Sequence, residues 1–167
     1  MAKDIIIKMS TASINDAIKE LQDIQADFER KLDLFVRTLV NDGVAVARTW
    51  IQSSATLERD ASVLWQVNQF GDIYRAQITM DGKDALFIEF GSGIYYNPQD
   101  TPHAGKYGMG IGTYPGQTHA FQNGWWYYDE YGQSKYSHGT QATMPMYHAS
   151  ESIQNEAILR ALQIFRS

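Results

Sequence analysis

The strongest constraint on the fold is a series of apolar residues that recurs every three or four positions through the first third of the chain. This spacing places the side chains on one face of an α-helix. Two acid–base pairs, Asp27 with Lys31 and Asp33 with Arg37, are four residues apart with the acid first, which is the more favourable order in a helix. The pattern predicts a long amphipathic helix over residues 13–54. Its apolar stripe consists of Ile14, Ile18, Leu21, Ile24, Phe28, Leu32, Phe35, Leu39, Val44, Ala47 and Trp50.

Two positions predict how this helix begins and whether it is continuous. Ser13, with Asp16 three residues later, is typical of a helix N-cap. Gly43 either produces a kink between two helices or lets a neighbouring element approach one continuous helix. The stripe itself can form the protein's own core or a coiled-coil seam with a partner. A sheet predicted downstream favours the core.

Residues 61–90 alternate apolar and polar side chains, which is the period of a β-strand with one buried face. Turn signals at Gly71 and Gly82 divide this segment. We therefore expect an antiparallel three-stranded meander, with residues 86–90 as its third strand. Glu89 would then lie either on the solvent face of an edge strand or opposite a cation of a neighbouring subunit.

The chain changes character after residue 90. Ten of the 13 glycines and eight of the ten tyrosines lie between residues 91 and 143. Residues 91–123 are too rich in glycine to form a strand core, so they predict a long extended loop. Residues 124–138 then read as a β-hairpin with a turn at Gly132.

A second amphipathic stripe follows Pro145, a residue that is favoured at the first position of a helix. It predicts a C-terminal helix over residues 145–165. The chain is thus predicted to be a single α+β domain, residues 1–167. We expect a long N-terminal helix and a C-terminal helix packed on an antiparallel β-sheet, with a long Gly/Tyr-rich loop.

The sequence gives little support for catalysis or for a cofactor. Cysteine is absent, so no disulfide or thiolate metal site can form. The glycine-rich loop lacks both the phosphate-binding and the dinucleotide-binding spacing. No spacing typical of metal ligands links the four histidines, which are His103, His119, His138 and His148. We predict no catalytic, cofactor-binding or metal-binding residues.

The net charge and the hydropathy of the chain limit the classes of partner that it can bind. The net charge is −5, without a basic block of the kind that binds duplex DNA. No segment approaches the roughly 18 uninterrupted apolar residues of a membrane span, and the short apolar run at the N-terminus does not resemble a signal peptide. We expect a protein made in a cytoplasm-like compartment that binds neither membrane nor specific DNA sequences.

Aromatic side chains are the remaining functional signal. A strand bearing Trp125, Trp126 and Tyr128 places large rings on both of its faces. The rings on the face that does not contact the core must then be covered by something else. That cover is the chain's own loop, a neighbouring subunit, or a ligand such as a sugar. The residues we predict at a subunit interface are Tyr95, Tyr96, Tyr107, Trp125, Trp126, Tyr128 and Glu89.

The order of motifs resembles the neck and tail-completion proteins of long-tailed phages. The resemblance covers roughly residues 40–165. It rests on Phe-Ile-Glu-Phe-Gly-Ser-Gly at residues 87–93, Gly124-Trp125 on the next strand, and Thr-Met-Pro-Met-Tyr-His-Ala at residues 143–149, before the last helix. Met146 stands where this family more often has Phe.

The resemblance implies a non-enzymatic structural subunit at the head–tail junction of a virion, assembled in the bacterial host's cytoplasm. It implies a ring of copies of this chain, with sixfold symmetry expected. The neighbours would be a head-completion or connector protein and a tail terminator or tail tube protein. DNA would pass through the ring without sequence-specific binding. The tyrosines and tryptophans leave an alternative, a carbohydrate-binding or wall-degrading accessory phage protein, and a small metal-dependent enzyme is a third possibility.

Overall fold

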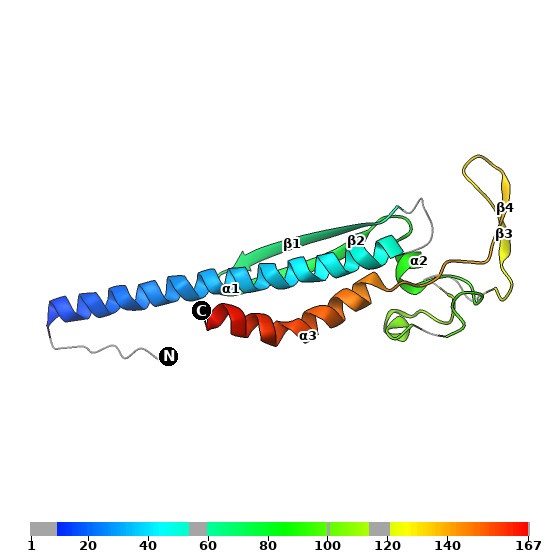
Figure 1. Ribbon diagram of the computed structural model, residues 1–167. Coiled ribbons are helices and arrows are strands. Elements are labelled where there is room, and N and C mark those ends of the chain that lie inside the picture. The colour runs from blue at the N-terminus through cyan, green and yellow to red at the C-terminus, as the bar shows by residue number, and fades with distance from the viewer. Residues whose placement is uncertain (1–9, 54–59, 100, 114–120, 167) are drawn as a thin grey trace.

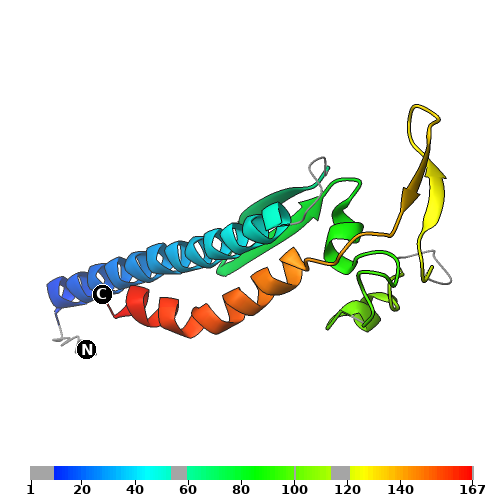
Figure 2. The same cartoon turned by 45° about the vertical axis from the view of Figure 1, so that its right-hand side comes forward.

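The computed structural model describes residues 10–53, 60–99, 101–113 and 121–166. The chain is α+β and elongated, as Figures 1 and 2 show. Helix α1 runs along most of the molecule, with the β1–β2 hairpin on one side of its C-terminal half and helix α3 on the other. The elements are α1 (Thr11–Ser53), β1 (Ser62–Phe70), β2 (Ile73–Asp81), α2 (Ala85–Phe90), the 3₁₀ helix η1 (Ala104–Tyr107), β3 (Trp125–Tyr128), β4 (Ser134–Ser137) and α3 (Pro145–Phe165).

Helix α1 is continuous and does not kink. Its N-cap is Ser10, whose Oγ accepts a hydrogen bond from the Ser13 N–H at 3.3 Å, so the helix starts earlier than predicted and Ser13 is not the cap. Gly43 is buried, and a Cβ at this position would lie 2.5 Å from Ile153 Cδ1 and 2.9 Å from Ile78 Cδ1. The close-neighbour interpretation of Gly43 is therefore confirmed, because this glycine lets α1 approach both α3 and β2.

The β1–β2 hairpin packs one face against α1. Its strands pair in an antiparallel register that runs from Ser62 opposite Asp81 to Phe70 opposite Ile73. A two-stranded hairpin is marginally stable alone in water, so its contact with the helices stabilises it. The buried centre of the molecule consists of Val40, Val44, Ala47, Val63 and Ala149, with Ile51, Val67, Ile78 and Met146 packed around it.

The predicted third strand is wrong, because Ala85–Phe90 forms the short helix α2. The Asp84 N–H donates to the Asp60 carbonyl at 3.2 Å, and the Asp60 N–H donates to Asp84 Oδ2 at 3.1 Å. These bonds hold the segment after β2 against the start of β1, so the chain leaves the sheet. Ile88, Glu89 and Phe90 are all buried, and a short apolar run of this kind fits either a strand or a helix.

Helix α3 has the predicted bounds and lies antiparallel along α1. The Trp50 ring stacks on His148 with centroids 3.9 Å apart, Arg160 Nε lies 2.9 Å from Asp42 Oδ2, and the Phe165 ring lies 5.6 Å from that of Phe28. The α1 stripe therefore contacts α3 from Phe28 onward, although Phe28 itself is 55% exposed, and its fully buried members are Val44 and Ala47. Before Phe28 its large apolar side chains are about half exposed, so the core interpretation does not extend to them.

The segment between α2 and β3 is only partly described. Residues 91–99, 101–113 and 121–123 contain η1, and Ser92 forms an isolated antiparallel bridge with Thr140. The rest of the predicted 91–123 loop, with His119, lies outside the described residues. The predicted hairpin at 124–138 is confirmed: β3 pairs with β4 from Trp125 opposite Ser137 to Tyr128 opposite Ser134, and Gly132 turns the chain with a φ of 73°.

Candidate subunit interface

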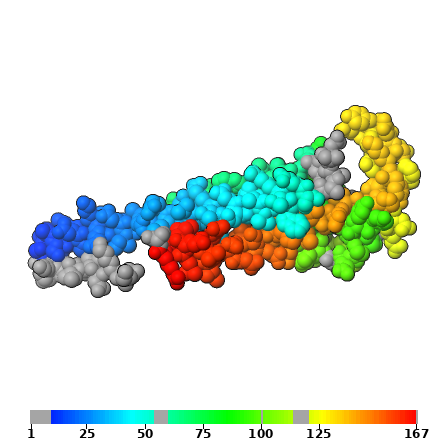
Figure 3. Space-filling model, viewed as in Figure 1, coloured from blue at the N-terminus to red at the C-terminus, as the bar shows by residue number. Residues whose placement is uncertain are grey.

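The β3–β4 hairpin, residues 124–138, forms an arm that stands away from the helical body (Figures 1 and 3). Strand pairing places Trp126 beside Tyr136 on one face, with ring centroids 5.2 Å apart in an edge-to-face arrangement. Tyr128 lies further along the same face. Trp126 is 69% exposed and Tyr128 is 77% exposed, so the chain leaves these rings uncovered.

Trp125 lies on the opposite face and fixes the arm to the rest of the chain. Its ring is half-buried and lies 5.6 Å from that of Phe121. A Cβ on Gly93, whose φ is +73°, would approach Trp125 Cζ3 to 3.1 Å. The Tyr136 hydroxyl also donates to the Asn123 carbonyl at the start of the arm. Neighbouring tryptophans in the sequence thus have different roles, since Trp125 anchors the arm and Trp126 faces solvent.

Asp129 orders the tip of the arm. Its Oδ1 accepts hydrogen bonds from the N–H groups of Tyr131 at 3.0 Å and Gln133 at 2.9 Å, and its Oδ2 lies 2.8 Å from Lys135 Nζ. The hydrogen bond from Lys135, followed by those from the two backbone amides, lowers the pKa of Asp129 below its usual value of 3.8. The turn therefore has a defined geometry, and it presents Tyr131, which is 80% exposed.

Glu89 joins the base of the arm to helix α3. The residue is 4% exposed; its Oε2 accepts from the Met146 N–H at 2.8 Å, and its Oε1 accepts from the Tyr147 N–H at 3.0 Å. His103 Nε2 lies 2.7 Å from Oε1. An anion at the first free amides of a helix is favoured by both hydrogen bonding and the helix dipole. The prediction of Glu89 as an inter-subunit or solvent-facing residue is wrong, because α2 turns this side chain inward to cap α3.

Aromatic rings pack around this carboxylate. The His103 ring stacks on Tyr147 with centroids 4.9 Å apart and lies 5.0 Å from Phe90. The Tyr147 hydroxyl donates to Glu151 Oε1 at 3.0 Å, and this bond raises the pKa of Tyr147. Tyr107 lies 5.7 Å from Phe90 yet remains 56% exposed. The predicted interface residue Tyr107 thus borders a packed cluster and keeps an outward surface.

Asn97 is the structural residue that the sequence did not reveal. Its Nδ2 lies 2.8 Å from the Thr140 carbonyl and 3.0 Å from the Gly93 carbonyl, and its Oδ1 accepts from the Ala142 N–H at 2.9 Å. A Cβ on Gly91 would lie 2.5 Å from Asn97 Oδ1, so a glycine is needed there. The bonds to Thr140 and Ala142 connect segments more than 40 residues apart, and no local pattern indicates them.

The predicted interface residues separate into three places. Tyr95 and Tyr96 lie at the root of the arm, 58% and 46% exposed, and the Tyr95 ring is 4.5 Å from that of His138. Trp126 and Tyr128 lie on the outer face of the arm itself. Tyr107 lies beside the Glu89 cluster. Exposed aromatic rings are therefore concentrated at one end of the molecule, around a base that Glu89 and Asn97 hold together.

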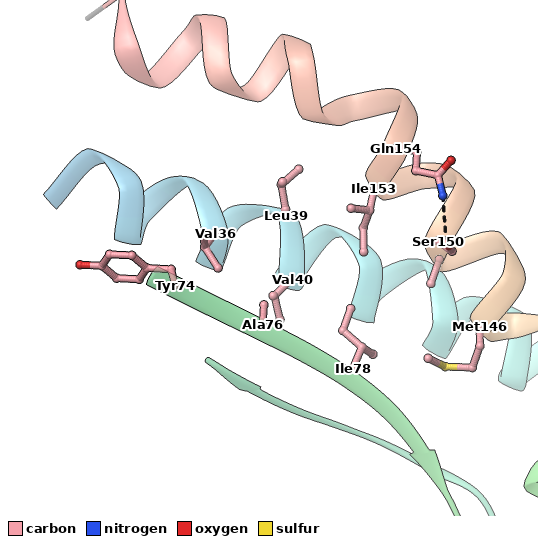
Figure 4. A pocket seen from close by; sticks show the side chains of 11 residues that line it. Val36, Leu39, Val40, Tyr74, Ala76, Ile78, Met146, Ser150, Ile153 and Gln154 are labelled. Atoms are coloured by element: carbon pink, nitrogen blue, oxygen red, sulfur yellow. Dashed lines mark hydrogen bonds between the residues drawn. The ribbon is translucent and has the colours of Figure 1, made fainter. Parts of the chain in front are cut away.

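The hollows of the described surface differ in chemistry. An open groove between α1, β2 and α3 is lined mostly by aliphatic side chains and by no charged one (Figure 4). A second hollow contains Glu89, His103 and Lys106. There the carboxylate already accepts from two backbone amides and contacts His103, so it is not free to act as a general base. Among the residues that the structure describes, no group of three acidic or histidine side chains is arranged to hold a metal ion.

Comparison with known proteins identifies no relative of this chain. No protein-family model, no curated protein and no solved structure matches the chain. Within the described part of the chain, no helix is long and apolar enough to span a lipid bilayer.

Proposed function

We propose that this chain is a virion structural subunit of the tailed-phage head–tail junction, a neck or tail-completion protein that forms a ring around the DNA passage. The observation that carries the proposal is the arm, a short hairpin whose outer rings are exposed while its base is fixed. Tryptophan and tyrosine dominate protein interfaces, because one end of the side chain packs while the other forms hydrogen bonds. A second copy of the chain is the partner that we assign to these rings.

The contact between the motif segments also supports the proposal. The segment at 87–93 and the segment at 143–149 lie far apart in the sequence, yet Glu89 of the first caps α3 at the amides of Met146 and Tyr147 of the second. Ser92 pairs with Thr140 beside them. The residues on which the family resemblance rests thus form one unit at the base of the arm, as expected if that unit positions an assembly contact.

The exposed area fits a subunit more than an isolated protein. The chain exposes 11922 Å². A compact protein of 18.9 kDa exposes about 8,300 Å². An arm of one subunit that packs on a different face of the next gives a heterologous contact, and such contacts close into a ring when the rotation between neighbours closes. The net charge of −5 fits a passage that does not retain DNA.

The test is to replace Trp126 with alanine and to measure joining of purified heads and tails together with thermal unfolding. Because Trp126 is 69% exposed, the midpoint of unfolding should stay within a degree or two, while joining falls at least about tenfold. Trp50→Ala is the matched control. Trp50 stacks on His148 between α1 and α3, so its removal should lower the unfolding midpoint.

Two results would count against the proposal. If the double variant Trp126→Ala/Tyr128→Ala joins heads to tails as well as the wild type does, the arm does not form the assembly contact. Binding of cell-wall glycan by the monomer, lost in the same variants while joining persists, would instead favour the carbohydrate-binding alternative. The edge-to-face packing of Trp126 on Tyr136 is unlike the flat ring platform that stacking on a sugar requires.

A further inference from the structure

The first part of α1, residues 11–27, extends beyond the rest of the body. Helix α3 reaches α1 only as far as Phe28, where the Phe165 ring packs. The 17 residues before it continue for about 25 Å at the rise of an α-helix, and Figures 1 and 2 show this blue end of α1 passing the red end of α3. We call residues 11–27 the α1 extension. Its large apolar side chains are exposed: Ile14 46%, Ile18 49%, Leu21 54% and Ile24 45%.

The α1 extension also fits the heptad repeat of a coiled coil. Residues 14, 18, 21, 25, 28 and 32 are separated alternately by four and three positions, an average of 3.5; all are apolar except Gln25, and Ile24 of the apolar stripe lies beside this seam. This repeat keeps one seam facing a partner helix along its whole length. Ile14, Leu21 and Phe28 occupy the d positions, and Ile18 and Gln25 occupy the a positions. From Phe28 onward the chain's own α3 packs against this side of α1, whereas the seam before it lacks a helical partner among the described elements.

Charge is absent from the seam of the α1 extension. All five of its charged residues occupy the outer positions b, c and f of the heptad. The positions that flank the seam, e and g, hold only uncharged side chains, which are Asn15, Gln22, Ile24 and Ala17, the last of which is already buried in the single chain. A second helix can therefore dock without burying a charge, which would cost several kcal/mol. The charged residues are Asp16, Lys19, Glu20, Asp23 and Asp27.

We propose that the α1 extension forms a parallel, in-register two-stranded coiled coil with the α1 extension of a second copy of this chain. Gln25 decides the orientation. In a parallel pair it lies opposite its own counterpart, and the two amides hydrogen-bond to each other. In an antiparallel pair, a positions face d positions, so Gln25 would face Ile14 and its amide would be buried without a partner. A single polar a position commonly specifies register in this way, at a cost in stability.

The coiled coil is short, so the affinity between the two helices is low. The α1 extension covers about two and a half heptads, and a lone helix of about 15 residues is only marginally stable in water. The pair therefore associates weakly in dilute solution and strongly where copies are held at high local concentration. This contact is separate from the aromatic arm, which lies at the other end of the molecule, and the inference does not rest on the proposed function.

The natural absence of cysteine allows a direct test by oxidative cross-linking of single-cysteine variants at high protein concentration. In a parallel, in-register pair, Ile14→Cys places two thiols across the seam within disulfide range. The expected result is that Ile14→Cys forms covalent dimers at least about tenfold faster than Asp16→Cys, whose side chain lies on the outer face. Equal rates for the two variants would overturn the proposal.

Two further measurements determine the orientation of the two helices and the identity of the partner. Fast cross-linking of Ile14→Cys with Gln25→Cys, but not of Ile14→Cys with itself, would indicate an antiparallel pair and overturn the parallel one. A third result would be an Ile14→Cys thiol that reacts freely in the pure protein and becomes protected only when head or tail particles are added. The seam would then bind a different protein, and the proposal would fail.

A reversible measurement complements the cross-linking. Leu21→Asp buries a charge in the seam, so the dissociation constant measured by sedimentation should rise at least about tenfold. Ala26→Asp places the same residue on the outer face and should leave that constant unchanged. Both positions are exposed in the single chain, so neither variant should alter the unfolding of the α1–α3 core. Unchanged association of Leu21→Asp would overturn the proposal.

Discussion

Glu89 illustrates how a single buried carboxylate can connect three segments of a chain. It belongs to α2, caps α3 through the amides of Met146 and Tyr147, and contacts His103 beside the 3₁₀ helix. Helix α3 begins at Pro145 after Met144, whose own side chain provides no cap and whose φ is 50°. A side chain distant in sequence therefore satisfies the free amides at the start of α3. The site has a structural role, since it fixes the base from which the aromatic arm projects.

Replacement of Glu89 by glutamine tests this role. Glutamine keeps the shape but removes the charge, and its NH₂ group faces a backbone N–H that needs an acceptor. Because hydrogen bonds to a buried charged group each contribute about 1.5–3 kcal/mol, we expect the free energy of unfolding to fall by about that amount. Urea denaturation followed by circular dichroism measures the change. Glu130→Gln, on the exposed surface of the arm, is the matched control, and equal midpoints for the two variants would contradict the capping role.

At the scale of elements, periodicity in the sequence predicted most of the secondary structure. The stripes at 13–54 and 145–165 gave both long helices, and alternation with turn glycines gave both hairpins. Periodicity mispredicted Ala85–Phe90, because a run of five apolar residues with one glutamate fits a strand or a helix equally well. The role of Asn97 was also unpredictable, since its partners at Thr140 and Ala142 come together only after the chain has folded.

The tip of the arm should respond to acid before the helical core does. The folded-state pKa of Asp129 is lowered, first by Lys135 and then by the amides of Gln133 and Tyr131. A carboxyl group whose pKa falls on folding stabilises the folded form above its unfolded-state pKa. That contribution is lost as the pH falls through the lower, folded-state value. We therefore expect the turn to hold its geometry above about pH 4 and to lose it below that pH.

Amide chemical shifts of Tyr131 and Gln133, followed by NMR as the pH is lowered, measure this transition. The Gly43 amide in the α1–α3 core is the internal reference and should not change in the same window. Asp129→Asn removes the titrating group, so its hairpin should be weaker at neutral pH and insensitive to pH between about 5 and about 2. A transition of the wild-type turn above the usual carboxyl pKa would refute this reasoning.

At the scale of the whole molecule, the two uncovered surfaces lie at opposite ends. The aromatic arm is at one end, and the exposed apolar seam of α1 is at the other (Figure 1). The sequence indicated both sets of residues, but it did not show that one apolar stripe divides into a buried half and an exposed half. That division depends on where α3 ends, at the contact of Phe165 with Phe28, and is therefore a property of the tertiary structure.

The symmetry of the proposed ring leads to a prediction about mixtures. In a heterologous contact each copy donates one arm and accepts another, so a Trp126→Ala copy still accepts an arm but no longer donates one. Every ring that incorporates such a copy has at least one broken junction. Joining of heads to tails should therefore fall much more steeply than linearly as the fraction of Trp126→Ala copies rises in a mixture with the wild type.

Native mass spectrometry and joining assays across a series of mixing ratios measure this dependence. Trp50→Ala provides the comparison at a temperature above its lowered unfolding midpoint, because unfolded copies drop out and joining should fall in proportion to the wild-type copies that remain. A linear decline for Trp126→Ala would mean that each copy acts alone. The arm would then contact a different protein or a ligand, because only a closed ring makes the integrity of one junction depend on all the others.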